Sequence, residues 1–339
     1  MMRDERREAP LLETVDLKKY FKVAGGMLHA VDGISLSVHR GKTLGIVGES
    51  GCGKSTLGRA ILRLIEPTSG DILFDSRSIM NSSKEQMRAL RRRMQIIFQD
   101  PYSSINPRMT VVEIIAEFLI VNRLFSSRAA CYAEAARLMD TVGLARRYAN
   151  VYPHELDGGR RQRIGIARAL SLQPEFIVCD EPVSALDVSI QAQILNLLMD
   201  LQEENRLTYL FITHNLSVVK HISDEIAVLY LGRMVERASS DALFASPLHP
   251  YTRALLAAIP EPDIAMRTRQ VAVIKGEITS PINPKPVCRF APRCAHVTGR
   301  CLSADPPLRE VAPGHFVACT LYDGVTPEAS GLQNPSQSH

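Results

Sequence analysis

The segment at 48–55 constrains the possible folds of this chain more than any other feature. It reads Gly-Glu-Ser-Gly-Cys-Gly-Lys-Ser and fits the pattern G-x-x-x-x-G-K-[ST]. An apolar, strand-like run at 43–47 precedes it, and apolar residues at helical spacing over 55–65 follow it. In this context glycines let backbone N–H groups surround a phosphate, and the helix N-terminus adds positive charge. The segment therefore predicts a nucleotide phosphate site rather than a chance glycine-rich turn.

The residues of this phosphate loop have separate expected roles. Lys54 would reach the β- and γ-phosphates, and Ser55 would hold Mg²⁺. The residues expected around the phosphates are Gly48, Ser50, Gly51, Cys52, Gly53, Lys54, Ser55 and Thr56.

A pair of carboxylates supplies what a magnesium-dependent nucleotide hydrolase also needs. The apolar run 176–179 reads as a central strand and ends in Asp180 and Glu181. Asp180 stands where a second-shell Mg²⁺ ligand belongs, and Glu181 can act as the general base toward water. Taken alone, this run could be a solvated strand end. Together with the phosphate loop, it indicates hydrolysis of a bound nucleotide.

Strand-like and helix-like segments alternate from residue 11 to about 260. A capping box at 110–113 opens a helix through Val121, 129–142 reads as another helix, and 207–213 reads as a strand. This alternation predicts an α/β fold with a mostly parallel sheet. After Ala258, prolines and four of the seven cysteines indicate a small second unit of irregular structure.

Composition and charge exclude several classes of protein. The net charge of +4 (40 basic minus 36 acidic residues) gives no basic footprint for nucleic acid. Apolar runs such as 226–231 are far shorter than the roughly 18–20 residues of a membrane-spanning helix. The charged start, MMRDERREAP, lacks the apolar region of a signal peptide. We therefore expect a cytosolic protein, at most peripheral to a membrane, whose cysteines are thiols or metal ligands.

Over about 11–260 the sequence resembles the ATP-binding subunits of ABC transporters. Four further motifs carry this resemblance in the family's order: the Q-loop at 96–101, the signature position at 156–163, the D-loop at 184–187 and the H-loop at 213–215. The resemblance implies a P-loop NTPase of the ABC type, with a RecA-like core, a helical subdomain and an antiparallel β subdomain. It also implies that Gln99 contacts Mg²⁺ and senses the membrane subunits, and that His214 contacts the γ-phosphate of ATP.

Two segments refine the resemblance. Pro-Leu-His-Pro-Tyr-Thr at 247–252 and the cysteine-rich segment after it look like those of oligopeptide, dipeptide and nickel importers. Lys-Lys-Tyr-Phe-Lys-Val at 18–23 looks like the adenine-stacking region, with Phe21 as the stacking residue and Tyr20 as the alternative. Either aromatic could instead pack in the core.

Composition and the resemblance together divide the chain into four parts. These are a polar start at 1–10, an ATP-binding domain at 11–258 with its helical subdomain at about 101–165, a Pro- and Cys-rich region at 259–325, and a disordered tail at 326–339.

The signature motif departs from the family's Leu-Ser-Gly-Gly-Gln. Asp157 replaces the serine and Arg160 the glutamine, while Gly158 and Gly159 are kept. In the family this motif faces the γ-phosphate bound by a second subunit. A carboxylate about 4 Å from a phosphate charge is repelled by about 4 kcal/mol at an effective dielectric of about 20. Arg160 could offset this, and Asp157 could also be the N-cap of a helix through Leu170.

A smaller departure follows the H-loop histidine, where Asn215 stands in place of the usual aspartate. We expect little effect, because asparagine also caps helices well.

Four cysteines near the C-terminus have the spacing C-x₅-C-x₆-C-x₁₇-C: Cys288, Cys294, Cys301 and Cys319. This is not the spacing of a zinc ribbon, but four thiolates in a cytosolic segment can hold a metal centre. The resemblance favours a [4Fe–4S] cluster, with Zn²⁺ second and free thiols third.

These observations predict the ATP-hydrolysing subunit of an importer for oligopeptides or dipeptides, peripheral at the cytoplasmic face of the membrane. The expected partners are two permease subunits, an extracytoplasmic binding protein acting indirectly, and a second, homologous ATPase in a heterodimer; nucleic acid is not expected. Two alternatives are a soluble ABC ATPase acting on DNA or ribosomes and a regulatory ATP-binding subunit. The solute itself stays open between peptides, nickel, sugars and opines.

Overall fold

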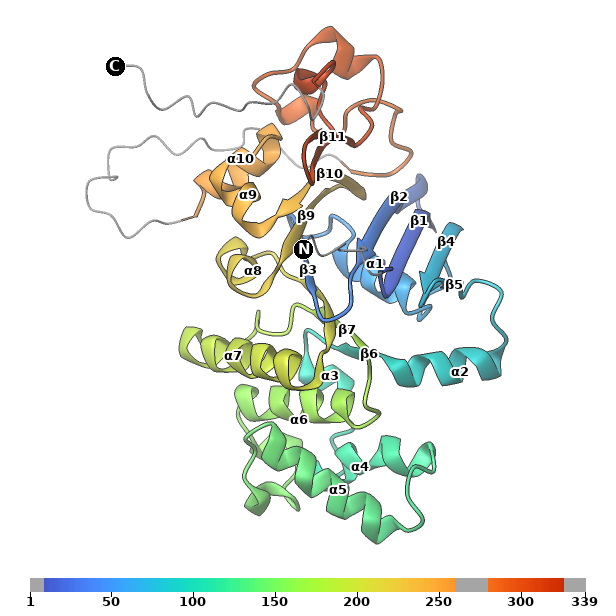
Figure 1. Ribbon diagram of the computed structural model, residues 1–339, viewed down its shortest axis with the longest axis vertical. Helices are drawn as coiled ribbons and strands as arrows, with labels where there is room; N and C mark the ends of the chain where they lie inside the picture. Colours follow the sequence, from blue (N-terminus) through green and yellow to red (C-terminus); the bar gives the residue numbers. More distant parts are fainter. Residues whose placement is uncertain (1–8, 260–279, 326–339) are drawn as a thin grey trace, which may run out of the picture. The chain divides into compact units, whose positions relative to one another are not determined.

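The computed structural model describes residues 9–259 and 280–325 (Figure 1). Its strands are β1 (Leu12–Val23), β2 (Gly26–Val38), β3 (Thr43–Val47), β4 (Ser69–Phe74), β5 (Arg77–Ser78), β6 (Met94–Ile97), β7 (Phe176–Asp180), β8 (Thr208–Ile212), β9 (Glu225–Tyr230), β10 (Arg233–Ser239), β11 (Arg309–Ala312) and β12 (His315–Val317). Its α-helices are α1 (Lys54–Ile61), α2 (Lys84–Arg93), α3 (Pro101–Ser104), α4 (Val111–Val121), α5 (Arg128–Thr141), α6 (Gly158–Leu170), α7 (Val188–Asn205), α8 (Leu216–Ile222), α9 (Ser240–Ala245) and α10 (Pro250–Ala257).

The described chain forms two compact units that are interleaved in sequence. The first unit contains 9–17, 35–44 and 58–213, and the second contains 18–34, 45–57, 214–259 and 280–325. The chain passes from one unit to the other within β1, β2, β3 and α1, and once more after β8.

In the first unit, β6, β7 and β8 are parallel neighbours, as the alternating pattern predicted. Every residue of β7 and β8 is buried, which explains why both read as continuous apolar runs. Asp180, the last residue of β7, pairs with Ile212, the last of β8, so both strands end at one edge. A second sheet places β4 between β1 and β5.

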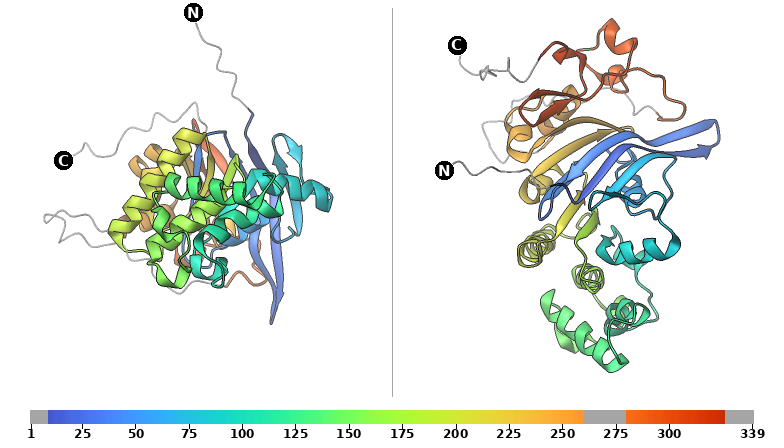
Figure 2. Two further views of the ribbon diagram at one scale, coloured as in Figure 1. Left: turned by 90° about the horizontal axis from the view of Figure 1, so that it is seen from below. Right: turned by 45° about the vertical axis from the view of Figure 1, so that its right-hand side comes forward.

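Helices α4, α5 and α6 pack against one another in the first unit, and Figure 2 shows them side by side in green. The predicted capping box is present: Glu113 accepts hydrogen bonds from the N–H and the hydroxyl of Thr110, at 2.8 and 2.9 Å. Ser127 caps α5 through the N–H of Ala130. All three helices were expected at these positions.

The helix expected over 55–65 is shorter than predicted, because α1 ends at Ile61. Arg63 adopts a left-handed conformation with φ 48°, and its N–H bonds the carbonyl of Ala60 in a tighter turn. Apolar spacing alone could not reveal this stop, since Leu62 is buried like a helix residue.

In the second unit, β9, β10, β12 and β11 follow one another as antiparallel neighbours. Residues 280–325 are largely irregular, as expected, yet β12 pairs with β10 and joins its sheet. The fully buried carboxylate of Glu236 on β10 accepts hydrogen bonds from the N–H groups of Leu248 and His249 and contacts Nε2 of His315 at 2.8 Å. The His315 contact links the C-terminal residues to β10, and the other two bonds link the start of α10 to the same strand.

Within the described ranges, no helix has the length and apolarity needed to cross a membrane. The polar start at 1–8 and the tail at 326–339 lie outside the described residues.

Candidate functional site

The phosphate loop joins β3 to α1 in the second unit. Gly48, Gly51 and Gly53 have positive φ angles of 154°, 77° and 103°. A Cβ on Gly48 would collide with the carbonyl oxygen of Leu229, and one on Gly53 with that of Ala30. The glycines are therefore required both by backbone conformation and by close approach to neighbouring strands.

Lys54 lies within this loop, and its side chain is only 4% exposed. Its ammonium group donates to the carbonyls of Gly48 and Glu49, at 2.8 and 2.9 Å, and lies 3.9 Å from the sulfur of Cys52. Burial raises the pKa of the Cys52 thiol, so the thiol stays neutral beside the Lys54 ammonium group. Ser55 and Thr56 follow in the first turn of α1.

The paired carboxylates stand at the end of β7 in the first unit. Asp180 is 1% exposed, and its Oδ2 lies 3.6 Å from the guanidinium of Arg59 on α1. The guanidinium therefore lies beside a carboxylate that is almost completely buried. No sequence motif indicated Arg59, because its role depends on the fold bringing α1 and β7 together.

Glu181 turns out of the strand with a left-handed φ of 48°, a conformation that costs a non-glycine residue about 1–2 kcal/mol. Its N–H donates to the carbonyl of Ile212 at 2.9 Å, and its own carbonyl accepts from the hydroxyl of Ser184 at 3.1 Å. The amide of Gln99 donates to its carboxylate at 3.0 Å. The structure thus brings together two residues that the sequence predicted separately.

The signature segment begins α6 with Asp157 as N-cap, as predicted. The Asp157 carboxylate accepts from the N–H of Arg160 at 2.8 Å and pairs with its guanidinium at 2.5 Å. The guanidinium also lies 4.9 Å from the centre of the Tyr148 ring. A Cβ on Gly158 or Gly159 would press on Leu186 or Ile190, so these glycines allow close packing at the D-loop.

His214, the H-loop histidine, is exposed. The residue after it caps α8 as expected, since Asn215 accepts hydrogen bonds from the N–H groups of Ser217 and Val218.

Of the two candidate stacking aromatics, Tyr20 stacks on His29, with ring centres 3.8 Å apart, and donates its hydroxyl to Asp32 at 2.5 Å. One face of Tyr20 is therefore already covered.

The other aromatic, Phe21, is partly buried and has the Lys19 ammonium 4.8 Å from its ring centre. Its ring makes no such stack on an aromatic neighbour among the described residues, which leaves Phe21 as the first candidate for contacting a base.

Comparison with known proteins agrees with these motifs. The profile of the ABC transporter family matches residues 31–184, and that of the oligopeptide/dipeptide transporter C-terminal region matches residues 235–301. YkfD of Bacillus subtilis (strain 168) is 51% identical over 318 residues, 93% of this chain and 97% of that protein. This chain belongs to the ABC transporter ATPases.

Similar ABC proteins include AppF of Bacillus subtilis (strain 168), an oligopeptide transport ATP-binding protein, which is 50% identical over 321 residues, 92% of this chain and 97% of that protein. Among solved structures, the ATP-binding cassette MJ0796 in a dimeric post-hydrolysis state with ADP and Pi has a TM-score of 0.63 and 28% identity. It covers 68% of this chain and 98% of its own. The ABC ATPase fold predicted from the motifs is therefore confirmed.

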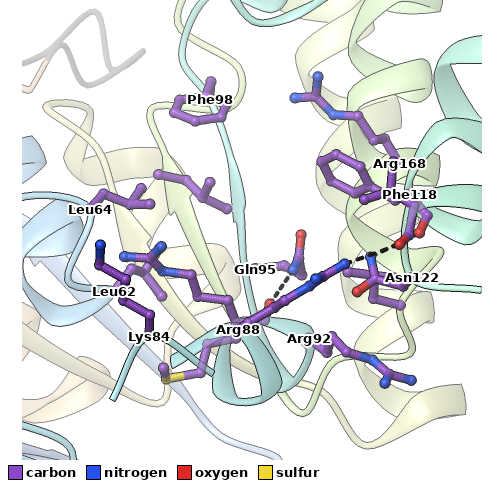
Figure 3. A pocket seen from close by; sticks show the side chains of 15 residues that line it. Leu62, Leu64, Lys84, Arg88, Arg92, Gln95, Phe98, Phe118, Asn122 and Arg168 are labelled. Atoms are coloured by element: carbon purple, nitrogen blue, oxygen red, sulfur yellow. Dashed lines mark hydrogen bonds between the residues drawn. The ribbon is translucent and has the colours of Figure 1, made fainter. Parts of the chain in front are cut away.

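The first unit of this ABC ATPase also contains a groove of about 400 Å³ (Figure 3). Its lining combines apolar and basic side chains and, among the described residues, includes no carboxylate. The apolar members include Leu62, Leu64, Phe98 and Phe118, and the basic members are Lys84, Arg88, Arg91, Arg92 and Arg168. Phe98 precedes Gln99, so the groove adjoins the Q-loop.

The four C-terminal cysteines are free thiols in distinct surroundings. Cys288 and Cys294 pack against the buried cluster around Tyr230, and Cys319 packs near Leu248. Cys301 is buried, with its sulfur 3.1 Å from the hydroxyl of Thr320. Across 9–259 and 280–325, no three His, Cys, Asp or Glu residues are arranged to hold a metal ion. The expected iron–sulfur or zinc centre thus finds no preformed site in the structure.

Burial raises the pKa of three of these thiols, that of Cys288 to about 11. Burial also acts to raise the pKa of Cys301, but hydrogen bonds with the threonine hydroxyls and with backbone groups together lower it. Cys301 is therefore the most easily ionised of the four.

Proposed function

We propose that this chain hydrolyses ATP to drive an ABC importer for oligopeptides or dipeptides. The observation that carries the proposal is the Gln99–Glu181 hydrogen bond beside the buried carboxylate of Asp180, in a chain with an intact phosphate loop. Similarity to an oligopeptide transport ATP-binding protein over 92% of the chain supports the solute class. The intact carboxylates count against a purely regulatory subunit, and the peptide-transporter C-terminal region counts against a soluble ABC ATPase.

We assign the chemistry residue by residue. Lys54 binds the β- and γ-phosphates, His214 contacts the γ-phosphate, and Glu181 orients and deprotonates the attacking water. Ser55, Gln99 and Asp180 carry the hard oxygen donors that Mg²⁺ prefers and would hold it. A bound Mg²⁺ would supply positive charge to neutralise the phosphate oxygens. The glycine N–H groups of the phosphate loop stabilise the charge that develops in the transition state.

The test is Glu181→Gln in the assembled transporter. The substitution keeps the shape and the Gln99 contact region but removes the base, so ATP should still bind while turnover falls by at least about 100-fold. Hydrolysis at the wild-type rate would show that the base is another residue.

As an ABC importer subunit, the chain works with transmembrane permease subunits, and we propose that the groove beside the Q-loop receives one of their cytoplasmic segments. Its apolar and basic lining side chains fit a short amphipathic segment that carries an acidic residue. Reversing the charge of one lining residue, Arg92→Glu, should weaken assembly with the permeases and leave ATP binding by the free chain unchanged. Unchanged assembly in pull-down experiments would reject this docking site.

We further propose that the second ATPase of the complex is a different, homologous chain. A homodimer would place Asp157 against both ATP molecules, whereas a heterodimer with a standard signature would weaken one site only. The exposed Asp157 carboxylate supports this proposal, because it would meet the phosphate bound by a partner subunit. Its ion pair with Arg160 offsets only part of its charge. Full transport by complexes containing this ATPase alone would overturn the heterodimer.

For the cysteines we propose a bound centre, [4Fe–4S] first and Zn²⁺ second, that would require the thiols to rearrange. All four are soft ligands in one segment, and their charges interact: ionised Cys301 raises the pKa of Cys288, Cys294 and Cys319. Analysis of iron, sulfide and zinc in anaerobically purified protein tests this. Absence of all three would leave four free thiols.

We propose the same domain limits and the same cellular location that the sequence indicates. The ATP-binding domain occupies 11–258 with its helical subdomain at about 101–165, and the C-terminal region occupies 259–325. The protein is peripheral, at the cytoplasmic face of the membrane, where its permease partners would anchor it.

A further inference from the structure

A largely buried ion pair connects the phosphate loop to the C-terminal residues. The guanidinium of Arg293 donates two hydrogen bonds to the carboxylate of Glu49, Nη1 to Oε2 at 2.8 Å and Nη2 to Oε1 at 3.1 Å. Nη1 also lies 3.3 Å from the hydroxyl of Tyr230. The side chains of Arg293 and Glu49 are only 6% and 21% exposed. This bidentate geometry fixes the orientation of the two side chains as well as pairing their charges.

A second contact reaches the same loop residue from α10. The backbone N–H of Glu49 donates to the hydroxyl of Tyr251 at 2.9 Å. Tyr251 is fully buried and packs edge-on against Tyr230, with ring centres 4.7 Å apart, and Phe290 lies against both rings. Glu49 is thus held by its side chain and its backbone, in both cases by residues far along the chain.

The position of Glu49 in the phosphate loop makes these contacts important for binding a nucleotide. It follows Gly48, and its own carbonyl accepts a hydrogen bond from the Lys54 ammonium. An unpaired carboxylate in this loop would repel a triphosphate and compete with it for Lys54. Arg293 neutralises that charge, and its pairing with Glu49 raises the pKa of the guanidinium further above its ordinary value.

We propose that residues after β10, Tyr251 on α10 and Arg293 in the C-terminal region, form part of the nucleotide site. Arg293 and Tyr251 are positioning residues: they hold the phosphate loop at Glu49 and cancel its negative charge, so the region after β10 sets the affinity for ATP. This inference rests on the proposed role of the phosphate loop in binding ATP.

The experiment measures MgATP dissociation constants of the purified full-length chain, together with kcat and KM of the assembled complex. Arg293→Gln should raise the dissociation constant about tenfold, which corresponds to about 1.4 kcal/mol, and should change kcat less than twofold. Arg293→Lys should recover part of the affinity. Tyr251→Phe, which removes only the acceptor for the Glu49 N–H, should raise the dissociation constant about threefold.

A double-variant cycle separates charge from general damage. Glu49→Gln removes the charge that Arg293 cancels, so the double variant Glu49→Gln with Arg293→Gln should bind ATP much better than Arg293→Gln alone. The loss in Arg293→Gln should also shrink as salt is added. Additive losses, or wild-type affinity in a folded Arg293→Gln protein, would overturn the proposal.

Two controls complete the design. Arg237 forms an ion pair with Glu225 at 2.6 Å in the same unit, so Arg237→Gln should lower thermal stability without changing ATP affinity. An equal loss of affinity in Arg237→Gln would reduce Arg293 to a purely structural role and overturn the proposal. Lys54→Ala should abolish binding. Retained binding in Lys54→Ala would reject the phosphate-loop assignment itself, a failure distinct from that of the Arg293 proposal.

Discussion

The phosphate loop and the signature segment are both expected to meet ATP, yet they are built differently. The phosphate loop has the standard sequence, a buried lysine, and a glutamate fixed by Arg293 and Tyr251 of its own chain. The signature segment has an altered sequence, and the side chains of Asp157 and Arg160 are 56% and 44% exposed and pair with each other.

The phosphate loop is therefore held by contacts within its own chain, whereas the signature side chains are exposed and would act only against a partner subunit. Contacts within the chain already hold Glu49 of the phosphate loop without a partner subunit. The exposed ion pair of the signature segment contributes little to stability, because solvent screens it. Its sequence is therefore free to change without loss of folding, and its consequences should appear only in an assembled complex.

The largest expected effect sharpens this contrast in the isolated chain. Lys54→Ala removes the ammonium group of the phosphate loop and should weaken MgATP binding by at least about 100-fold, as expected for loss of a charged contact to phosphate in a buried site. Asp157→Ala should leave binding by the free chain within about twofold. Titration calorimetry on both variants measures this, and comparable losses would mean that the two segments do not differ in this way.

A moderate effect is expected when the signature is restored. Asp157→Ser together with Arg160→Gln gives the usual family sequence and removes the carboxylate that would face a phosphate. We expect ATP hydrolysis by the assembled complex to rise about fivefold, since Arg160 already offsets part of the repulsion.

Arg160→Gln alone serves as the matched control for that change. It leaves Asp157 without its partner and should lower the rate. No gain in the restored double variant would show that the altered signature is not what limits turnover.

Local patterns predicted much of the fold and of the site. The glycines of the phosphate loop, the buried strand before Asp180 and the caps at Thr110, Asp157 and Asn215 all depend on neighbours within a few residues, and each is present. Such features are encoded where they occur, through backbone conformation and short-range hydrogen bonds.

Features that depend on distant residues could not be predicted in the same way. Arg293 meets Glu49 across 244 positions, and Arg59 meets Asp180 only because the chain folds back between them. No spacing rule links such pairs. The early end of α1 was not predicted either. Leu62 and Ile65 keep helical spacing, although the backbone leaves the helix at Arg63.

The smallest expected effect concerns pH and the brace on the phosphate loop. His249 caps α10 by accepting the N–H of Tyr251 at Nδ1, and burial, assisted by the charge of Arg253, lowers its pKa to about 4, against the attraction of Glu236. Between about pH 6.5 and pH 4, His249 is therefore protonated in the unfolded chain but neutral in the folded chain.

Stability should consequently stay level above pH 7 and fall as the pH is lowered, by somewhat less than about 1 kcal/mol between pH 7 and pH 6. Hydrogen exchange of α10 amides at the two pH values, corrected for intrinsic rates, measures this opening. His249→Asn is the matched control, because asparagine still caps a helix but does not titrate. Its α10 should show a flatter pH profile than the wild type, while α6, which Asp157 caps, should respond alike in both proteins. Identical profiles for α10 in the two proteins would remove His249 as the source of the acid sensitivity.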